Sequence, residues 1–197
     1  GNGNYFYIDN MLEAEKVFSK EMHANLFTIA KDVKIQIEFN PNTIKAYRLI
    51  GYENRMLVKE DFDNDTIDAS ELGAGHTVNA IYELILVGSV SEQTVHQTMP
   101  LIYHKVIQDN NSDDLMTVKF RYKKPEGAKS ILTEQVLGKQ SIPALSATSV
   151  TFRFSVAVAG IGMLLRDSEY KSSCSYKTMI DLANASKGAD NNGYRSE

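Results

Sequence analysis

Strict alternation of apolar and polar residues distinguishes the segment that runs from residue 33 to residue 40. The apolar set is Val33, Ile35, Ile37 and Phe39, and the polar set is Lys34, Gln36, Glu38 and Asn40. Because successive side chains of a strand point to opposite faces, this period predicts a strand with the apolar set facing the core. The strand is expected over 27–40, and it ends at the turn-forming sequence Asn-Pro-Asn at 40–42.

The rest of the chain predicts a succession of strands followed by two helices. Further strands are expected over 46–53, 76–87, 101–107, 115–122 and 130–137. The strand over 76–87 is apolar on both faces, which predicts a central position in its sheet. An acidic loop is expected over 60–75.

Helical spacing of apolar residues predicts helices over 12–22, 151–165 and 175–187. Ser175 or Ser173 fits the N-cap of the last helix, and Gly188 fits its C′ position. Strands that follow one another, rather than alternating with helices, favour an α+β fold. We therefore predict a mainly antiparallel, sandwich-like sheet with a short N-terminal helix and two C-terminal helices.

Composition and charge narrow the range of functions. The 197 residues are 43% hydrophobic and 23% charged, as in an ordinary globular protein, and the net charge is −4. An acidic balance gives no electrostatic reason to expect a nucleic-acid partner. The longest nearly apolar run, 154–165, is too short to cross a bilayer as a helix. Cys174 is the single cysteine, so neither an intrachain disulfide nor a cysteine-based zinc site is expected.

Several sequence stretches together resemble the region that follows the von Willebrand factor A domain in bacterial YfbK-like proteins. The clearest are AKDVKIQIEFNP (30–41), YRLIGYENR (47–55), EDF (60–62), GAGHTVNAIYEL (73–84) and VKFRYKKP (118–125). Weaker ones are FRFSVAVAGIGMLLRDS (152–168), SYKTMIDLA (175–183) and GYR (193–195). Residues 1–25 resemble the last strand and helix of such an A domain. We therefore predict a domain remnant over 1–25 and a β-rich module over 26–197.

The resemblance implies a function that the residues alone do not. It implies a non-enzymatic interaction or structural module, held in cis against an upstream A domain of the adhesion type. The setting would be the bacterial cell envelope on the periplasmic side, with a lipid anchor and other envelope proteins as further partners. Adhesion-type A domains bind a divalent metal through an Asp-x-Ser-x-Ser loop, which this chain lacks. The metal is therefore implied only for the upstream domain, and no cofactor is expected here.

An acidic loop and a glycine turn support an alternative function, a ligand-binding or hydrolytic module. Asp61, Asp63 and Asp65 occupy alternate positions and Asp68 follows, a pattern that can converge on Ca²⁺. The calcium-loop template fails where it requires glycine and glutamate, at Thr66 and Leu72, so a solvated acidic loop is the other interpretation. The sequence Gly-Ala-Gly-His at 73–76 could bring backbone amides to an anion, with His76 as acid or base, or it could be a tight turn.

Two clusters of tyrosine and arginine are the candidate interaction residues. The first consists of Tyr47, Arg48, Tyr52, Glu53 and Arg55, and the second of Arg121 and Tyr122. Tyrosine and arginine are enriched where protein interfaces bind most strongly. In the alternative interpretation the tyrosines cover the edge of the core and the arginines pair with nearby acidic residues.

Overall fold

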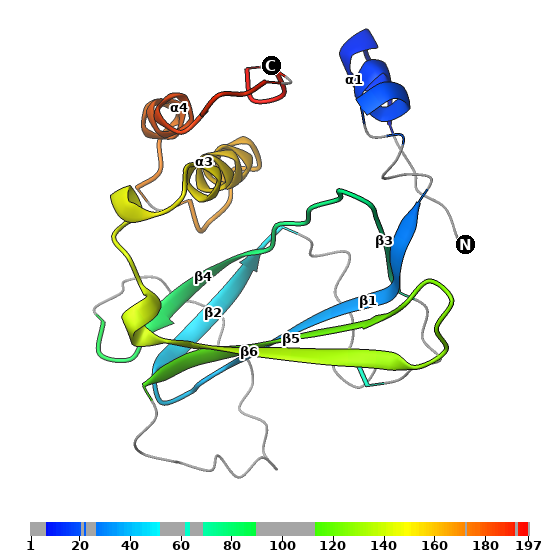
Figure 1. Cartoon of the computed structure of the whole chain (residues 1–197). Helices are drawn as coiled ribbons and strands as arrows, with labels where there is room; N and C mark the ends of the chain where they lie inside the picture. The colour runs from blue at the N-terminus through cyan, green and yellow to red at the C-terminus, as the bar shows by residue number, and fades with distance from the viewer. Residues whose placement is uncertain are drawn as a thin grey trace. The chain divides into compact units, whose positions relative to one another are not determined.

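The computed structural model describes residues 7–20, 22, 27–51, 62–63, 69–89, 113–171, 173–191 and 193–196 (Figure 1). The chain divides into two compact units. Unit 1 consists of Gly1–Asn40, Met56–Val78 and Asp114–Leu137, and unit 2 consists of Pro41–Arg55, Asn79–Asp113 and Gly138–Glu197. The predicted domain boundary after residue 25 stays a prediction, as does the predicted strand over 101–107, which lies outside the described residues.

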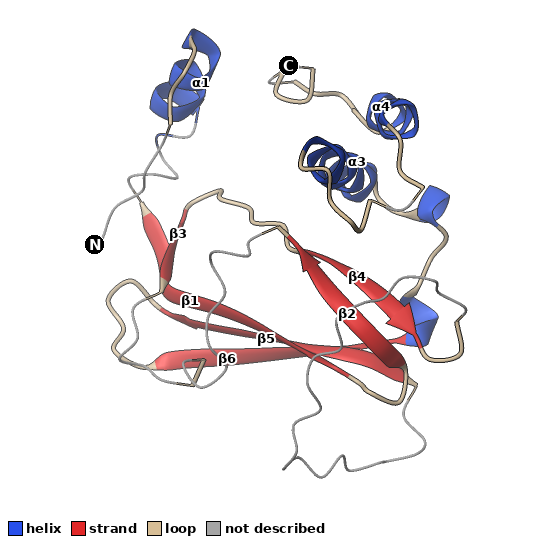
Figure 2. Ribbon diagram, turned by 180° about the vertical axis from the view of Figure 1, so that it is seen from behind, coloured by secondary structure: helices blue, strands red, loops and turns tan. Residues whose placement is uncertain are grey.

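Unit 1 contains a four-stranded sheet with the order β3-β1-β5-β6 (Figure 2). The central strands β1 (Thr28–Phe39) and β5 (Asp114–Lys123) pair in antiparallel register, with Ile35 opposite Phe120. At the two edges lie β3 (Ser70–Gly73), antiparallel to β1, and β6 (Ser130–Gly138), beside β5. The strands predicted over 27–40, 115–122 and 130–137 are therefore confirmed. The expectation of a loop over 60–75 is wrong for residues 70–73, which form β3. Four residues are too few to show the alternation of a strand.

The alternation over 33–40 predicts strand β1 correctly but only partly predicts its buried face. Ile35 is 53% exposed, whereas Lys34, expected in water, is only 3% exposed. Asp63 forms an ion pair with Arg121, which lies opposite Lys34, so residues 62–63 lie over the face that carries the lysine. Phe62, beside Asp63 in the chain, is buried. The expectation that Ile35 faces the core is wrong, because alternation separates two faces without showing which one another segment covers.

Unit 2 contains a two-stranded antiparallel sheet of β2 (Ile44–Ile50) and β4 (Ile81–Leu86). Ile44 pairs with Leu86 and Ile50 with Ile81. The expectation of a central strand over 76–87 is wrong for the described residues, among which β4 has β2 as its one neighbour. Apolar side chains on both faces indicate that both faces of a strand are covered. They do not indicate how many neighbouring strands hydrogen-bond to it.

Two helices complete unit 2. Helix α3 (Val150–Leu165) begins after Ser149, whose hydroxyl accepts a hydrogen bond from the Phe152 amide at 3.1 Å. Two short 3₁₀ turns, η4 (Lys139–Ser141) and η5 (Leu145–Ala147), precede it. Helix α4 (Tyr176–Ala185) packs against α3. The predicted helix over 151–165 is thus confirmed.

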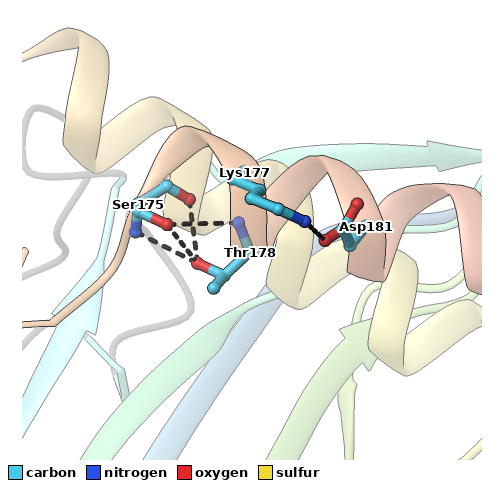
Figure 3. A network of polar contacts seen from close by, with 4 residues as sticks. All are labelled: Ser175, Lys177, Thr178 and Asp181. Carbon is cyan, nitrogen blue, oxygen red and sulfur yellow. Dashed lines mark hydrogen bonds and ion pairs between the residues drawn. The ribbon is translucent and has the colours of Figure 1, made fainter.

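The start of α4 is a capping box, as Figure 3 shows. The hydroxyl of Ser175 accepts a hydrogen bond from the Thr178 amide at 3.2 Å, and the Thr178 hydroxyl accepts one from the Ser175 amide at 3.1 Å. One turn further, Lys177 pairs with Asp181 at 2.6 Å. Ser175 is therefore confirmed as the N-cap. Gly188 has a φ of +69° but follows the C-cap Ser186 by two residues, one later than predicted.

The N-terminal helix predicted over 12–22 changes its winding along its length. Helix α1 (Met11–Glu15) is capped by Asn10, whose side-chain oxygen accepts a hydrogen bond from the Glu13 amide at 2.8 Å. It continues as a π-helical segment, η1 (Lys16–Lys20). The α+β class is confirmed, with antiparallel strands, a short N-terminal helix and two C-terminal helices. No helix within the described ranges combines the length and apolar character of a membrane span.

Candidate functional site

Arg48, a predicted interaction residue, connects the two-stranded sheet of unit 2 to the end of α3. It lies on β2 opposite Glu83 on β4, and its Nη2 donates a hydrogen bond to the Glu83 carboxylate. The guanidinium carbon is 4.2 Å from the centre of the Tyr170 ring, and Nη2 is 3.7 Å from the Met163 sulfur. The side chain is only 18% exposed. The Arg48 guanidinium therefore interacts with groups of its own unit, as the alternative interpretation of this cluster predicts.

Tyr47 lies on the other face of β2 and is partly exposed. It shares this face with Tyr82 of β4, because Leu49 is opposite Tyr82 and Tyr47 is opposite Leu84. Burial raises the pKa of Tyr82, and the nearby Tyr47 raises it further. Tyr82 therefore keeps its proton near neutral pH. Tyr52, Glu53 and Arg55 lie outside the described residues, so their part in an interaction surface stays a prediction.

Arg121, the second predicted arginine, is also paired within its own unit. Its Nη1 donates a hydrogen bond to the Asp63 carboxylate at 3.0 Å, and its side chain is 17% exposed. Tyr122 lies on the opposite face of β5, with its ring centre 5.4 Å from that of Phe120. Arg48 belongs to unit 2 and Arg121 to unit 1. The two clusters are thus separate local arrangements, each built around a pairing of arginine with a carboxylate.

The alternative site at the acidic loop gains no support from the described residues. Asp63 is held by Arg121, and Asp61, Asp65 and Asp68 lie outside the described residues. The His76 amide donates a hydrogen bond to the Gly73 carbonyl at 3.1 Å, and Gly75 has a φ of +84°. This geometry confirms a tight turn in which glycine supplies the positive φ. In the part of the chain that the structure describes, no three His, Cys, Asp or Glu side chains gather as metal ligands.

Asp32 occupies an irregularity in β1 that the sequence alone did not predict. The β1–β5 register shifts between Lys31 and Lys34, and Asp32 has a φ of +49°, in the left-handed region. Its carboxylate accepts hydrogen bonds from Lys123 Nζ at 2.7 Å and from the Ala69 amide at 3.3 Å. The hydrogen bond from Lys123 holds the pKa of Asp32 below its ordinary value. The carboxylate thereby links β1 to β5 and to the segment that leads into β3.

We expect Asp32→Asn to reduce the acid sensitivity of the fold. Asparagine tolerates the left-handed backbone and retains an acceptor for Ala69, so the change removes mainly the charge beside Lys123. Because the folded pKa is lowered, this pair stabilises the fold above the unfolded pKa, and the stabilisation is lost as pH falls through the folded pKa. The expected loss at neutral pH is about 1 kcal/mol.

Urea unfolding at pH 7 and at pH 3 measures this prediction. The gap in stability between Asp32→Asn and the unchanged chain should be largest at pH 7 and should shrink towards pH 3. A gap that is equal at both pH values would contradict the role assigned to the Asp32 charge.

Arg195 was not singled out in the sequence for chemistry, yet it organises the end of unit 2. Its Nη1 donates hydrogen bonds to the carbonyls of Ser186 and Lys187, at 3.4 and 3.0 Å. Its Nη2 is 3.3 Å from the Thr151 hydroxyl, and its guanidinium carbon lies 4.9 Å from the centre of the Phe154 ring. Arg195 therefore ties the end of α4 to the start of α3. The signal in the sequence was the short motif GYR at 193–195.

The comparison with protein families agrees with the sequence stretches that carry the resemblance. Residues 24–197 match the family described as "Uncharacterized protein YfbK, C-terminal". The chain belongs to this family. The Uncharacterized protein YfbK of Escherichia coli (strain K12) is 43% identical over 197 residues, which are 100% of this chain and 33% of that protein. No solved structure matches the chain significantly.

Membership of the YfbK C-terminal family confirms the predicted resemblance and gives its extent. The chain spans about a third of the length of the curated relative that it matches. The family match begins at residue 24, so α1 and η1 precede it. Arg48, Arg121 and Arg195 each lie in a stretch that carried the resemblance, and each is bound within its own unit. These stretches therefore include residues that hold the fold together.

Proposed function

We propose that the chain is a non-enzymatic interaction module of a longer bacterial cell-envelope protein. In this proposal it is held in cis against the upstream region, which contains a von Willebrand factor A domain of the adhesion type. The resemblance supports the identity of that upstream domain and the envelope setting. The membership of a C-terminal family supports the presence of an upstream region in the longer protein.

The exposed apolar face of the N-terminal helical segment carries this proposal. Met11 is 83% exposed, Phe18 is 68% exposed and Met22 is 43% exposed. In the same segment Val17 is a buried apolar residue, and Glu13 and Lys16 form an ion pair at 3.3 Å. Large apolar side chains grouped on one short segment are typical of a surface that another domain covers.

The position of this segment argues for a partner in the same polypeptide. The family match begins at residue 24, directly after the segment, and the curated relative is about three times as long as the chain. A helix that immediately precedes the module would be the first element to meet the upstream domain. Its apolar side chains would then be covered without any diffusional encounter between separate molecules, because both surfaces belong to one polypeptide.

Phe18→Ser tests the proposal directly. We expect the purified chain to bind the separately purified upstream region, and we expect Phe18→Ser to weaken this binding at least about tenfold, since buried aromatic anchors dominate interfaces. Titration calorimetry gives the affinities. Phe152→Ser is the control, because Phe152 is a phenylalanine that is 46% exposed but lies on α3 of unit 2.

Fusing the two parts provides an independent measurement. The upstream region should raise the melting temperature of the module and protect the amides of α1 from hydrogen exchange, because binding stabilises the folded state. If the isolated parts do not bind and the fused parts show no such change, cis docking is excluded. Equal affinities for Phe18→Ser and the unchanged chain would exclude this segment as the docking surface.

A further inference from the structure

Strand β6 forms a long edge of the sheet in unit 1. Its nine residues, Ser130–Gly138, have β5 as their one neighbour among the described strands. The five central side chains, 132–136, are all exposed, whereas those of β5 from Leu115 to Lys123 are partly or fully covered. Leu132 is 48% exposed and Val136 is 50% exposed. An edge strand also presents backbone N–H and C=O groups that can pair with a further strand.

The two edges of this sheet differ in how they are protected. The opposite edge, β3, has four residues, and its pairing with β1 is interrupted by two register shifts. Short edge strands and irregular pairing are features that discourage the addition of another strand. β6 is longer, with nine residues, and its sequence SILTEQVLG contains no lysine and no proline. Its edge therefore retains the properties that strand addition requires.

A row of alternating charges crosses the sheet and ends at β6. Glu38 of β1 is 3.1 Å from Lys119 of β5, and Lys119 is 3.9 Å from Glu134 of β6. The signs run negative, positive, negative towards the edge. Glu134 is half-exposed and shares its face of the strand with Leu132 and Val136, because alternate residues point the same way. A cation on a neighbouring strand would continue this row.

We propose that β6 accepts an extended segment of another polypeptide as a fifth strand. The segment would carry a lysine or arginine opposite Glu134, with apolar residues two positions to either side facing Leu132 and Val136. A second copy of β6 fits less well, because Glu134 is the central residue of Ser130–Gly138. Full antiparallel overlap would place two carboxylates opposite each other, which is destabilising. This surface is separate from the N-terminal segment on which cis docking rests.

Two peptides that differ at one position test the proposal. The peptide TVTKTVT has the proposed pattern, and TVTETVT replaces its central lysine by glutamate. We expect the chain to bind TVTKTVT at least about fivefold more tightly, by nuclear magnetic resonance titration at millimolar peptide, with the shifts concentrated on β6 amides. Glu134→Lys should reverse the preference, which a merely unfolded variant could not do.

A control variant separates this local effect from net charge. Glu126→Lys changes the charge by the same amount in the exposed turn between β5 and β6, and it should leave the preference for TVTKTVT unchanged. Absence of binding, or an unchanged preference in Glu134→Lys, would overturn the proposal. A dimer that sediments as such and dissociates on Glu134 substitution would assign the edge to a second copy and would also overturn it. Phe18→Ser should bind TVTKTVT normally, so the two proposals fail separately.

Discussion

Arg48→Met is expected to lower the free energy of unfolding by about 2–3 kcal/mol, because it leaves the Glu83 carboxylate without its guanidinium partner in a mostly covered site. Methionine keeps much of the apolar contact that the arginine side chain makes, so the change removes mainly the charge and the donors. The variant also loses the contact with the Tyr170 ring. Urea unfolding followed by circular dichroism measures the loss.

A double-mutant cycle with Glu83→Gln isolates the energy of the pair. The double variant should lose less stability than the sum of the two single variants, because either single change already breaks the interaction. Lys177→Met is the matched control, since the Lys177–Asp181 pair has side chains 84% and 62% exposed. Its expected loss is about 0.5 kcal/mol or less. Additive losses for Arg48 and Glu83 would show that the pair does not contribute as a unit.

Gly160→Ala is expected to be less stable than Gly162→Ala by about 1–3 kcal/mol, because only Gly160 lies against a neighbouring side chain. A Cβ on Gly160 would be 2.3 Å from the Met179 sulfur and 3.0 Å from its Cγ, whereas a Cβ on Gly162 would meet nothing within 4 Å. Both changes gain about 1 kcal/mol from the better helix propensity of alanine. Their difference therefore reports the packing of α3 against α4.

Thermal unfolding of the two glycine variants measures this difference. Combining Gly160→Ala with Met179→Ala should recover part of the lost stability, since alanine at 179 leaves room for the new methyl group. Equal melting temperatures for Gly160→Ala and Gly162→Ala would show that Met179 moves aside at little cost. In that case close approach at Gly160 would not be what holds the two helices together.

Local patterns in the sequence predicted most of the elements. The alternation over 33–40 predicted β1, and the apolar run over 151–165 predicted α3, because both patterns follow from the geometry of the isolated element. Ser175 was predicted as an N-cap because a hydroxyl three residues before a free amide satisfies it locally. β3 was missed, since four residues at the end of a polar loop carry no detectable period.

The roles of the candidate residues depended on partners that are distant in the sequence. Arg48 and Arg121 were recognised by residue type, but only the fold brings Arg48 to Glu83 and Tyr170, and Arg121 to Asp63. The role of Arg195 was not predicted, because its partners lie after the end of α4 and at the start of α3. A sequence motif contains a side chain's donors, whereas the acceptor that each donor finds is a property of tertiary contact.

The family and most of the order of strands and helices were determined by the sequence itself, since motifs and periods follow the chain residue by residue. Tertiary structure decided which faces are covered. On β1, Ile35 is half in solvent, whereas Lys34 is buried on the face where Asp63 pairs with Arg121. Tertiary structure also placed β6 at the edge of its sheet among the described strands, with Glu134 at the end of a row of charges. The physical reason is that burial is decided by the segments that pack onto a strand, and these come from elsewhere in the chain.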